Sequence, residues 1–280
     1  MRIPRIEMNT RNIIFIVIIV VCVLALSYGI YYQIFVKKQK PVEVPDVPKT
    51  IQDVTFENIF DNKLNLQDYT SADFVSKLDP TKEVVYTSYT LNEIYEGKYE
   101  IQASIPMINI RNDKTIAIDK EFLAIFYDKI NNIIESAKKE GTPKTIYTVT
   151  YTAYLNENIL SLVIKANLKE GENAQRTIIK AYTYNISTNE EINLEDLLEI
   201  KKINKTDVET QIKQTVEQAK KEADNLETMG YQVYKRDLKS DIYKVENVDN
   251  YFLGPNGSIY IIYAYGNANF TTECDVVFIK

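Results

Sequence analysis

The chain has 280 residues, of which 45% are hydrophobic and 26% are charged, so it is long and apolar enough for one or two folded domains. It contains no histidine, which excludes the Ser-His-Asp, Cys-His and HExxH schemes of catalysis. The net charge is −6, but six basic residues and one acidic residue in the first 40 positions leave residues 41–280 with −11. A body this acidic is not expected to bind nucleic acid through its phosphates.

A membrane anchor is predicted near the N-terminus. Residues 12–36 carry no charge, and a helix over residues 13–36 would be about 36 Å long, enough to cross a bilayer core of about 30 Å. Residues 1–12 then form a cytoplasmic tail, and the body lies outside the cell. Two alternatives are signal-peptidase cleavage at Ala25-Leu26-Ser27 and lipidation of Cys22. An uncleaved single-pass anchor is favoured because the apolar run continues to Val36.

The body is predicted to be α+β, with antiparallel sheets and two main helices. Residues 37–50 are rich in proline and charge and should form an extended spacer. Residues 51–170 would form a first α+β part, and residues 171–280 a second. Alternating apolar and polar residues predict strands at 83–91, 99–105, 145–155, 159–168, 176–186, 258–265 and 273–279.

Helix signals separate these strands. A three- and four-residue apolar period predicts a helix over residues 118–137. Asn193 can cap a short helix over residues 194–198, and Thr206 with Glu209 has the spacing of a capping box for a longer helix that Gly230 stops. Pro106 should end its strand or lie at a sheet edge.

Three stretches resemble the extracytoplasmic module of the RsiV-like family. They are YEIQASIPMI (residues 99–108), AYTYNISTNEEINLEDLLE (residues 181–199) and NYFLGPNGSIYIIYAYGNANFTTECDVVFI (residues 250–279). The resemblance covers about residues 83–280, and its motifs mark a scaffold that carries no catalytic residue.

The resemblance implies an envelope protein that binds a ligand outside the cell. In that family the module forms the lysozyme-binding part of a membrane-bound anti-sigma factor or the N-terminal part of a peptidoglycan deacetylase. This chain departs from both contexts. Residues 1–12 are too short for a sigma-binding domain, and the deacetylase domain needs histidine ligands, which are absent.

For each individual motif, a structural role is favoured over a catalytic or metal-binding role. Ser136 and Lys139 have S-x-x-K spacing but lie at a helix end without a Lys-Thr-Gly box. Cys274 lies between two acidic residues, which disfavours a thiolate. The remaining candidates are the carboxylate pairs Glu190-Glu191 and Glu195-Asp196, expected at a turn and a helix start, and the incomplete calcium pattern of Asn247, Asp249 and Asn250. No cofactor, metal or catalytic residue is therefore expected.

Tyrosine is the one abundant residue type that could serve binding, with 21 copies. Tyr263 and Tyr265 should share one face of their strand and Tyr260 the other, so we expect at least one exposed ring for a ligand. The leading hypothesis is a non-catalytic, single-pass membrane protein whose outer module binds a cationic protein such as lysozyme, or peptidoglycan. A carboxylate-dependent wall hydrolase and an architectural subunit of an envelope complex are the alternatives.

Overall fold

The computed structural model describes residues 56–67 and 75–280. The expected tail (1–12), membrane span (13–36) and spacer (37–50) lie outside these residues. Within the described ranges, no helix combines the length and the apolar composition that a membrane crossing requires. The described residues all belong to one compact unit, Val54–Lys280.

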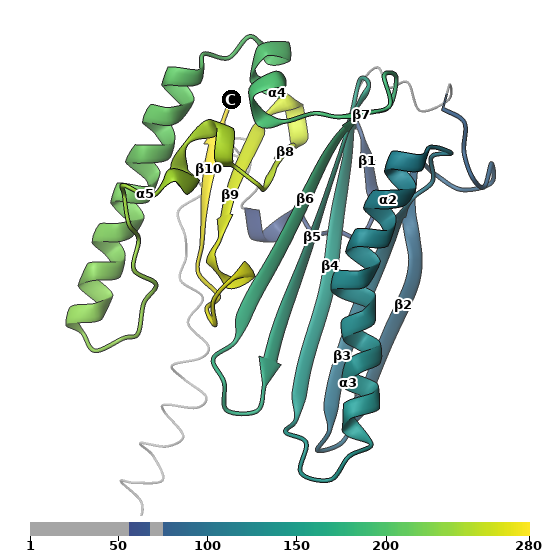
Figure 1. Cartoon of the computed structure of the whole chain (residues 1–280), viewed down its shortest axis with the longest axis vertical. Helices are drawn as coiled ribbons and strands as arrows, with labels where there is room; N and C mark the ends of the chain where they lie inside the picture. Colours follow the sequence, from purple (N-terminus) through teal and green to yellow (C-terminus); the bar gives the residue numbers. More distant parts are fainter. Residues whose placement is uncertain (1–55, 68–74) are drawn as a thin grey trace, which may run out of the picture. The chain divides into compact units, whose positions relative to one another are not determined.

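A seven-stranded mixed sheet is the largest element of this unit (Figure 1). Its strands follow the order β2-β3-β4-β5-β6-β7, and β1 pairs with β4 beside this path. Antiparallel pairing predominates, as expected, but β3/β4 and β1/β4 are parallel. A helical crossover joins β3 to β4, which is the kind of connection that parallel neighbours need. The strands are β1 (Leu64–Leu66), β2 (Val85–Tyr95), β3 (Tyr99–Ile108), β4 (Thr145–Asn156), β5 (Ile159–Glu170), β6 (Arg176–Asn185) and β7 (Glu190–Glu191).

Pro106 does not end its strand, because β3 continues to Ile108. The pairing of β3 with β4 stops at Ala103, whereas its pairing with β2 continues through Pro106. Pro106 therefore lies where β3 has a partner on one side only, so the predicted edge position is confirmed.

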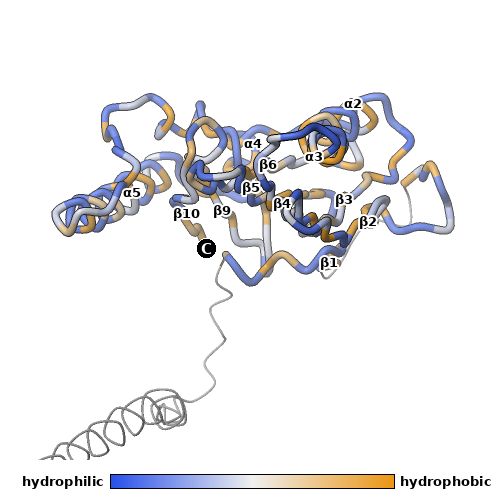
Figure 2. The backbone as a smooth tube through the Cα atoms, turned by 90° about the horizontal axis from the view of Figure 1, so that it is seen from below, coloured by the Kyte–Doolittle hydropathy of each residue, from blue (hydrophilic) through white to orange (hydrophobic). Residues whose placement is uncertain are grey.

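One interrupted helix covers one face of the large sheet (Figure 2). It consists of α2 (Asp113–Phe122), the π-helical turn η4 (Leu123–Tyr127) and α3 (Asp128–Ala137). It begins five residues before the predicted start, because the side chain of Asn112 accepts a hydrogen bond from the Lys114 N–H at 2.8 Å and caps it. Its side chains Phe122, Phe126 and Ile130 are fully buried against the sheet.

A second, antiparallel sheet lies against the opposite face of the large one. Its order is β10-β9-β8, with β8 at Tyr251–Leu253, β9 at Ile259–Ala264 and β10 at Cys274–Ile279. Phe252 of β8 stacks on Tyr154 of β4, with ring centroids 6.0 Å apart. The turn η8 (Tyr265–Asn267) crosses β6 closely, because a Cβ on Gly266 would lie 2.0 Å from the Thr177 carbonyl oxygen. Glycine at this position thus permits the contact between η8 and β6.

Four further helical elements pack on the outer side of this small sheet. They are α4 (Leu194–Lys201), α5 (Lys205–Thr228) and the 3-10 turns η5 (Asp241–Tyr243) and η6 (Val245–Asn247). Asn193 caps α4 as predicted, but the predicted capping box of α5 is wrong. Asn204 caps α5, since its Oδ1 accepts from the Thr206 N–H at 2.8 Å. Gly230 follows α5 with a φ of +89°, as its predicted stop role requires.

The α+β class and the two main helices are confirmed. The expected division between residues 170 and 171 falls in the turn between β5 and β6, which are neighbours in the same sheet. The two expected parts therefore share the large sheet.

Candidate functional site

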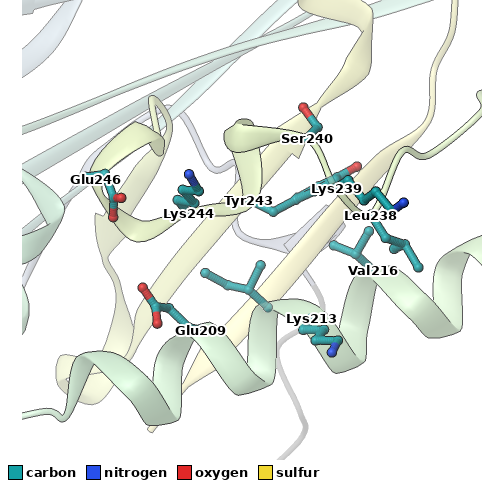
Figure 3. A pocket seen from close by; sticks show the side chains of 10 residues that line it. Glu209, Lys213, Val216, Leu238, Lys239, Ser240, Tyr243, Lys244 and Glu246 are labelled. Atoms are coloured by element: carbon teal, nitrogen blue, oxygen red, sulfur yellow. The ribbon is translucent and has the colours of Figure 1, made fainter.

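A groove between α5 and the chain that follows it is the most site-like feature of the described residues (Figure 3). After Gly230 the chain turns back along α5, and we call residues 231–250 the return segment. The space between them, which we call the α5 groove, has a volume of about 420 Å³, within the range of ligand sites. It is lined by Glu209, Ile212, Lys213 and Val216 of α5 and by Leu238, Lys239, Ser240, Tyr243, Lys244 and Glu246 of the return segment.

The floor of the α5 groove is apolar. Ile212 and Val216 are 1% exposed and belong to the core beneath the helix. Figure 3 shows Val216 projecting from α5 toward Leu238 and Tyr243 across the groove. Leu238 is 40% exposed, so it can still bury apolar surface against a ligand.

The rim of the groove carries charges of both signs. Lys205 Nζ lies 2.6 Å from Glu195 Oε1 and 3.0 Å from Glu246 Oε2, and these bonds raise its pKa. Lys244 pairs with Asp241 at 2.7 Å. Within the described part of the chain, Glu209 and Lys239 of the lining form no ion pair. A charged ligand could therefore pair with either of them without displacing an internal partner.

A buried polar network lies directly below the groove. Tyr243 Oη is 2.9 Å from Tyr265 Oη, which donates to Asp275 Oδ2 at 2.6 Å. Arg236 binds both Asp275 oxygens, from Nε at 2.7 Å and Nη2 at 2.8 Å, and its Nη1 reaches Glu273 at 2.9 Å. This network ties the return segment to β10 and η8, and so it holds Tyr243 in the groove.

The protonation states of this network are set by burial and by its own bonds. Burial disfavours the charge on Arg236, but the bonds to Asp275 and Glu273 outweigh burial and raise its pKa. Burial raises the pKa of Tyr265, and its bond to Asp275 raises it further. At neutral pH Arg236 is therefore charged and Tyr265 is a neutral donor.

The three candidate tyrosines are all buried. Tyr260, Tyr263 and Tyr265 are 6%, 7% and 5% exposed, so the expectation of an exposed ring is wrong. The expected alternation is confirmed, since Tyr263 and Tyr265 face the core under α5 and Tyr260 faces the large sheet. Tyr263 meets the Tyr243 ring edge to face at 5.0 Å. Tyr263 and Tyr265 thus support the groove from below, and direct ligand binding by them stays a prediction.

The other candidates have structural partners. Ser136 lies in the last turn of α3, where its carbonyl accepts from the Lys139 N–H. Asn250 Oδ1 accepts from the Ala181 N–H at 3.0 Å and is not free for calcium. Burial and, secondarily, Asp275 raise the pKa of Cys274 to about 12. In residues 56–67 and 75–280, no three acidic or cysteine side chains gather closely enough to hold a metal.

Comparisons with known proteins give structural neighbours only. No protein-family profile matches the chain, and no match was found among curated proteins. One neighbour is a crystal structure from Pseudomonas aeruginosa PAO1, at 9% identity and a TM-score of 0.40, covering 70% of this chain and 86% of that one. Another is from Bacteroides fragilis NCTC 9343, at 11% identity and a TM-score of 0.33, covering 70% and 88%. Both are DUF3298 family proteins. TM-scores below 0.5 do not establish a shared fold, so function is inferred from this chain's own residues.

Sequence reasoning missed most of the groove. Ile212 stands at a four-residue apolar step from Val208, which predicts that it faces inward, but no pattern places residues 231–250 against the helix. Tyr243, Leu238 and Lys239 lie in a stretch without regular periodicity. Their position depends on the distant partners Asp275 and Glu273, which no local signal identifies.

Proposed function

We propose that this protein is a single-pass, membrane-anchored binding module of the bacterial envelope, that its body lies outside the cell, and that it has no catalytic activity of its own. Its ligand is a cationic protein of the lysozyme class, and the α5 groove receives a lysine or arginine side chain of that ligand. The observation that carries the proposal is Glu209 at the edge of an apolar groove, where its carboxylate has no ion-pair partner among residues 56–67 and 75–280.

The groove lining holds two glutamates and three lysines, of which Lys213 and Lys244 have acidic partners. A long cationic side chain suits the end at Glu209, which lies away from Lys239 (Figure 3). The aliphatic part of a lysine or arginine can lie on Ile212 and Leu238 while its head group reaches Glu209. The charge of −11 on residues 41–280 adds long-range attraction for a cationic partner. A sugar ring would instead stack on an exposed aromatic face, and Tyr243, the aromatic residue of the lining, is half-buried.

Charge reversal at Glu209 is the expected way to weaken this binding. In calorimetric titrations of the full chain in nonionic detergent, we expect Glu209→Lys to weaken lysozyme binding about 10- to 100-fold, since it replaces an attraction by a repulsion. Raising the salt concentration should weaken lysozyme binding by the wild-type chain and reduce the difference in affinity between wild type and Glu209→Lys.

Glu172→Lys is the matched control, because it makes the same change in net charge on an exposed turn. It should change the affinity less than about threefold, as expected for a screened, distant charge. Equal weakening by both variants would show non-specific attraction and would contradict a role for the groove. Turnover of wall glycan, lost in a single Glu→Gln variant that still folds, would instead support a hydrolase.

The proposed location has its own test. Protease added to intact spheroplasts should digest the body, whereas the same protease should leave it intact if the body faces the cytoplasm. Recovery of the protein in the membrane fraction, and its loss from that fraction on deletion of residues 13–36, would support the anchor.

A further inference from the structure

The outer edge of β10 presents unused backbone groups. The Tyr265 N–H donates to the Glu273 carbonyl at 3.2 Å, which sets the alternation of the β9–β10 ladder. Asp275, Val277 and Ile279 then face β9 with their N–H and C=O groups, while those of Cys274, Val276 and Phe278 point away. Because β10 is the last strand of its sheet, these outward groups have no strand partner among the described residues.

This edge opens into a second groove, which we call the edge groove. Figures 1 and 2 both place α5 beside β10. The space between them has a volume of about 530 Å³ and is bounded by Cys274–Val276 on one side and by α5 residues from Gln214 to Glu222 on the other. An added strand would lie about 4.8 Å from β10, so its backbone could complete the outward hydrogen bonds.

The charges around the edge groove favour a basic segment. Of the residues that the structure describes, no lysine or arginine lines it. Glu222 lines the α5 side, where its carboxylate accepts a hydrogen bond from Gln218 at 2.8 Å. The Asp275 carboxylate is already paired with Arg236. Glu222 is therefore the charge that a ligand in this groove would meet.

We propose that the edge groove binds an extended segment of a partner polypeptide, which adds a fourth strand to the β8–β10 sheet and places a lysine or arginine against Glu222. This inference goes beyond the proposed function, because it uses another side of α5 and does not depend on lysozyme binding in the α5 groove. Backbone pairing would supply affinity, and Glu222 would select basic segments.

The test uses a fluorescent peptide, Lys-Thr-Val-Lys-Val-Thr-Val-Lys, titrated with the full chain in nonionic detergent and followed by anisotropy. A control peptide carries proline at two of the valine positions, because proline cannot donate to a β-ladder. Empty micelles give the background for both peptides. We expect saturable binding of the first peptide and at least about tenfold weaker binding of the control, which corresponds to about 1.4 kcal/mol.

Two variants locate the site. Val276→Pro removes an outward N–H without breaking a β9–β10 bond, and Glu222→Lys reverses the selecting charge. Each should weaken peptide binding about tenfold or more. Glu172→Lys, the control of equal charge change, should leave it within about twofold, as for a distant screened charge. If circular dichroism shows that Val276→Pro does not fold, the Glu222→Lys variant and the proline-containing control peptide test the proposal.

Several outcomes would overturn the proposal. The peptide could bind no better than its proline control, or bind both variants as tightly as wild type. Light scattering could show a dimer of the wild-type chain that Val276→Pro abolishes, which would assign the edge to a second copy. If the wild-type chain binds the peptide but does not bind lysozyme, only the proposed function is refuted.

Discussion

Replacing Arg236 with methionine is expected to lower the free energy of unfolding by about 3 to 5 kcal/mol. Arg236 is 8% exposed and Asp275 5%, and the guanidinium binds both oxygens of that carboxylate. Methionine would leave the Asp275 charge buried without a counter-ion, next to Glu273. The return segment would lose its tie to β10, so the same variant should also weaken any ligand of the α5 groove.

The measurement is denaturant unfolding of residues 54–280, followed by far-ultraviolet circular dichroism. A double variant, Arg236→Met with Asp275→Leu, should regain most of the lost stability, because removing a buried ion pair entirely costs less than removing one partner. Lys221→Met on the exposed face of α5 is the control and should change stability by less than about 0.5 kcal/mol. If the free energy of unfolding of Arg236→Met falls by less than about 1 kcal/mol, the result would contradict a buried ion pair between Arg236 and Asp275.

Asp119 gives the second large effect, and it depends on pH. One carboxylate oxygen of Asp119 accepts from the Ile108 N–H at 2.9 Å, while Oδ2 is buried and has no hydrogen-bond partner in the described part of the chain. Burial raises the pKa of Asp119 from 3.8 to about 7, although the bond from Ile108 opposes this. The folded state therefore keeps a proton that the unfolded state releases, and its stability should fall as pH rises from about 4 through about 7.

Asp119→Asn should remove this dependence. Asparagine keeps the acceptor for Ile108 and cannot ionise, so the variant should be about 1 to 3 kcal/mol more stable than wild type at pH 8. Near pH 5 the difference should shrink, since wild-type Asp119 is then mostly neutral. Asp249→Asn, an exposed control, should follow the wild-type curve. Unfolding curves at both pH values that do not distinguish Asp119→Asn from wild type would refute the raised pKa.

Local signals predicted most of the elements. The alternation in residues 145–155 and 159–168, and the apolar period in 118–137, depend on residues adjacent in the chain, and all three elements are confirmed. The α5 cap was predicted at the wrong residue, because Asn204 and Thr206 are both good capping residues two positions apart. Parallel pairing of β3 with β4 had no local signal, since strand direction depends on the route of the helix between them.

The sequence by itself determined that the body is α+β, acidic, free of histidine chemistry and rich in tyrosine. Only the tertiary structure decided how these properties are used. Tyr263 and Tyr265 support a groove from below instead of facing solvent, because Arg236, 39 residues before Asp275, brings the return segment onto the small sheet. Grooves and open strand edges arise where distant segments meet, and the energy that places those segments comes from buried, non-local contacts that composition and periodicity do not encode.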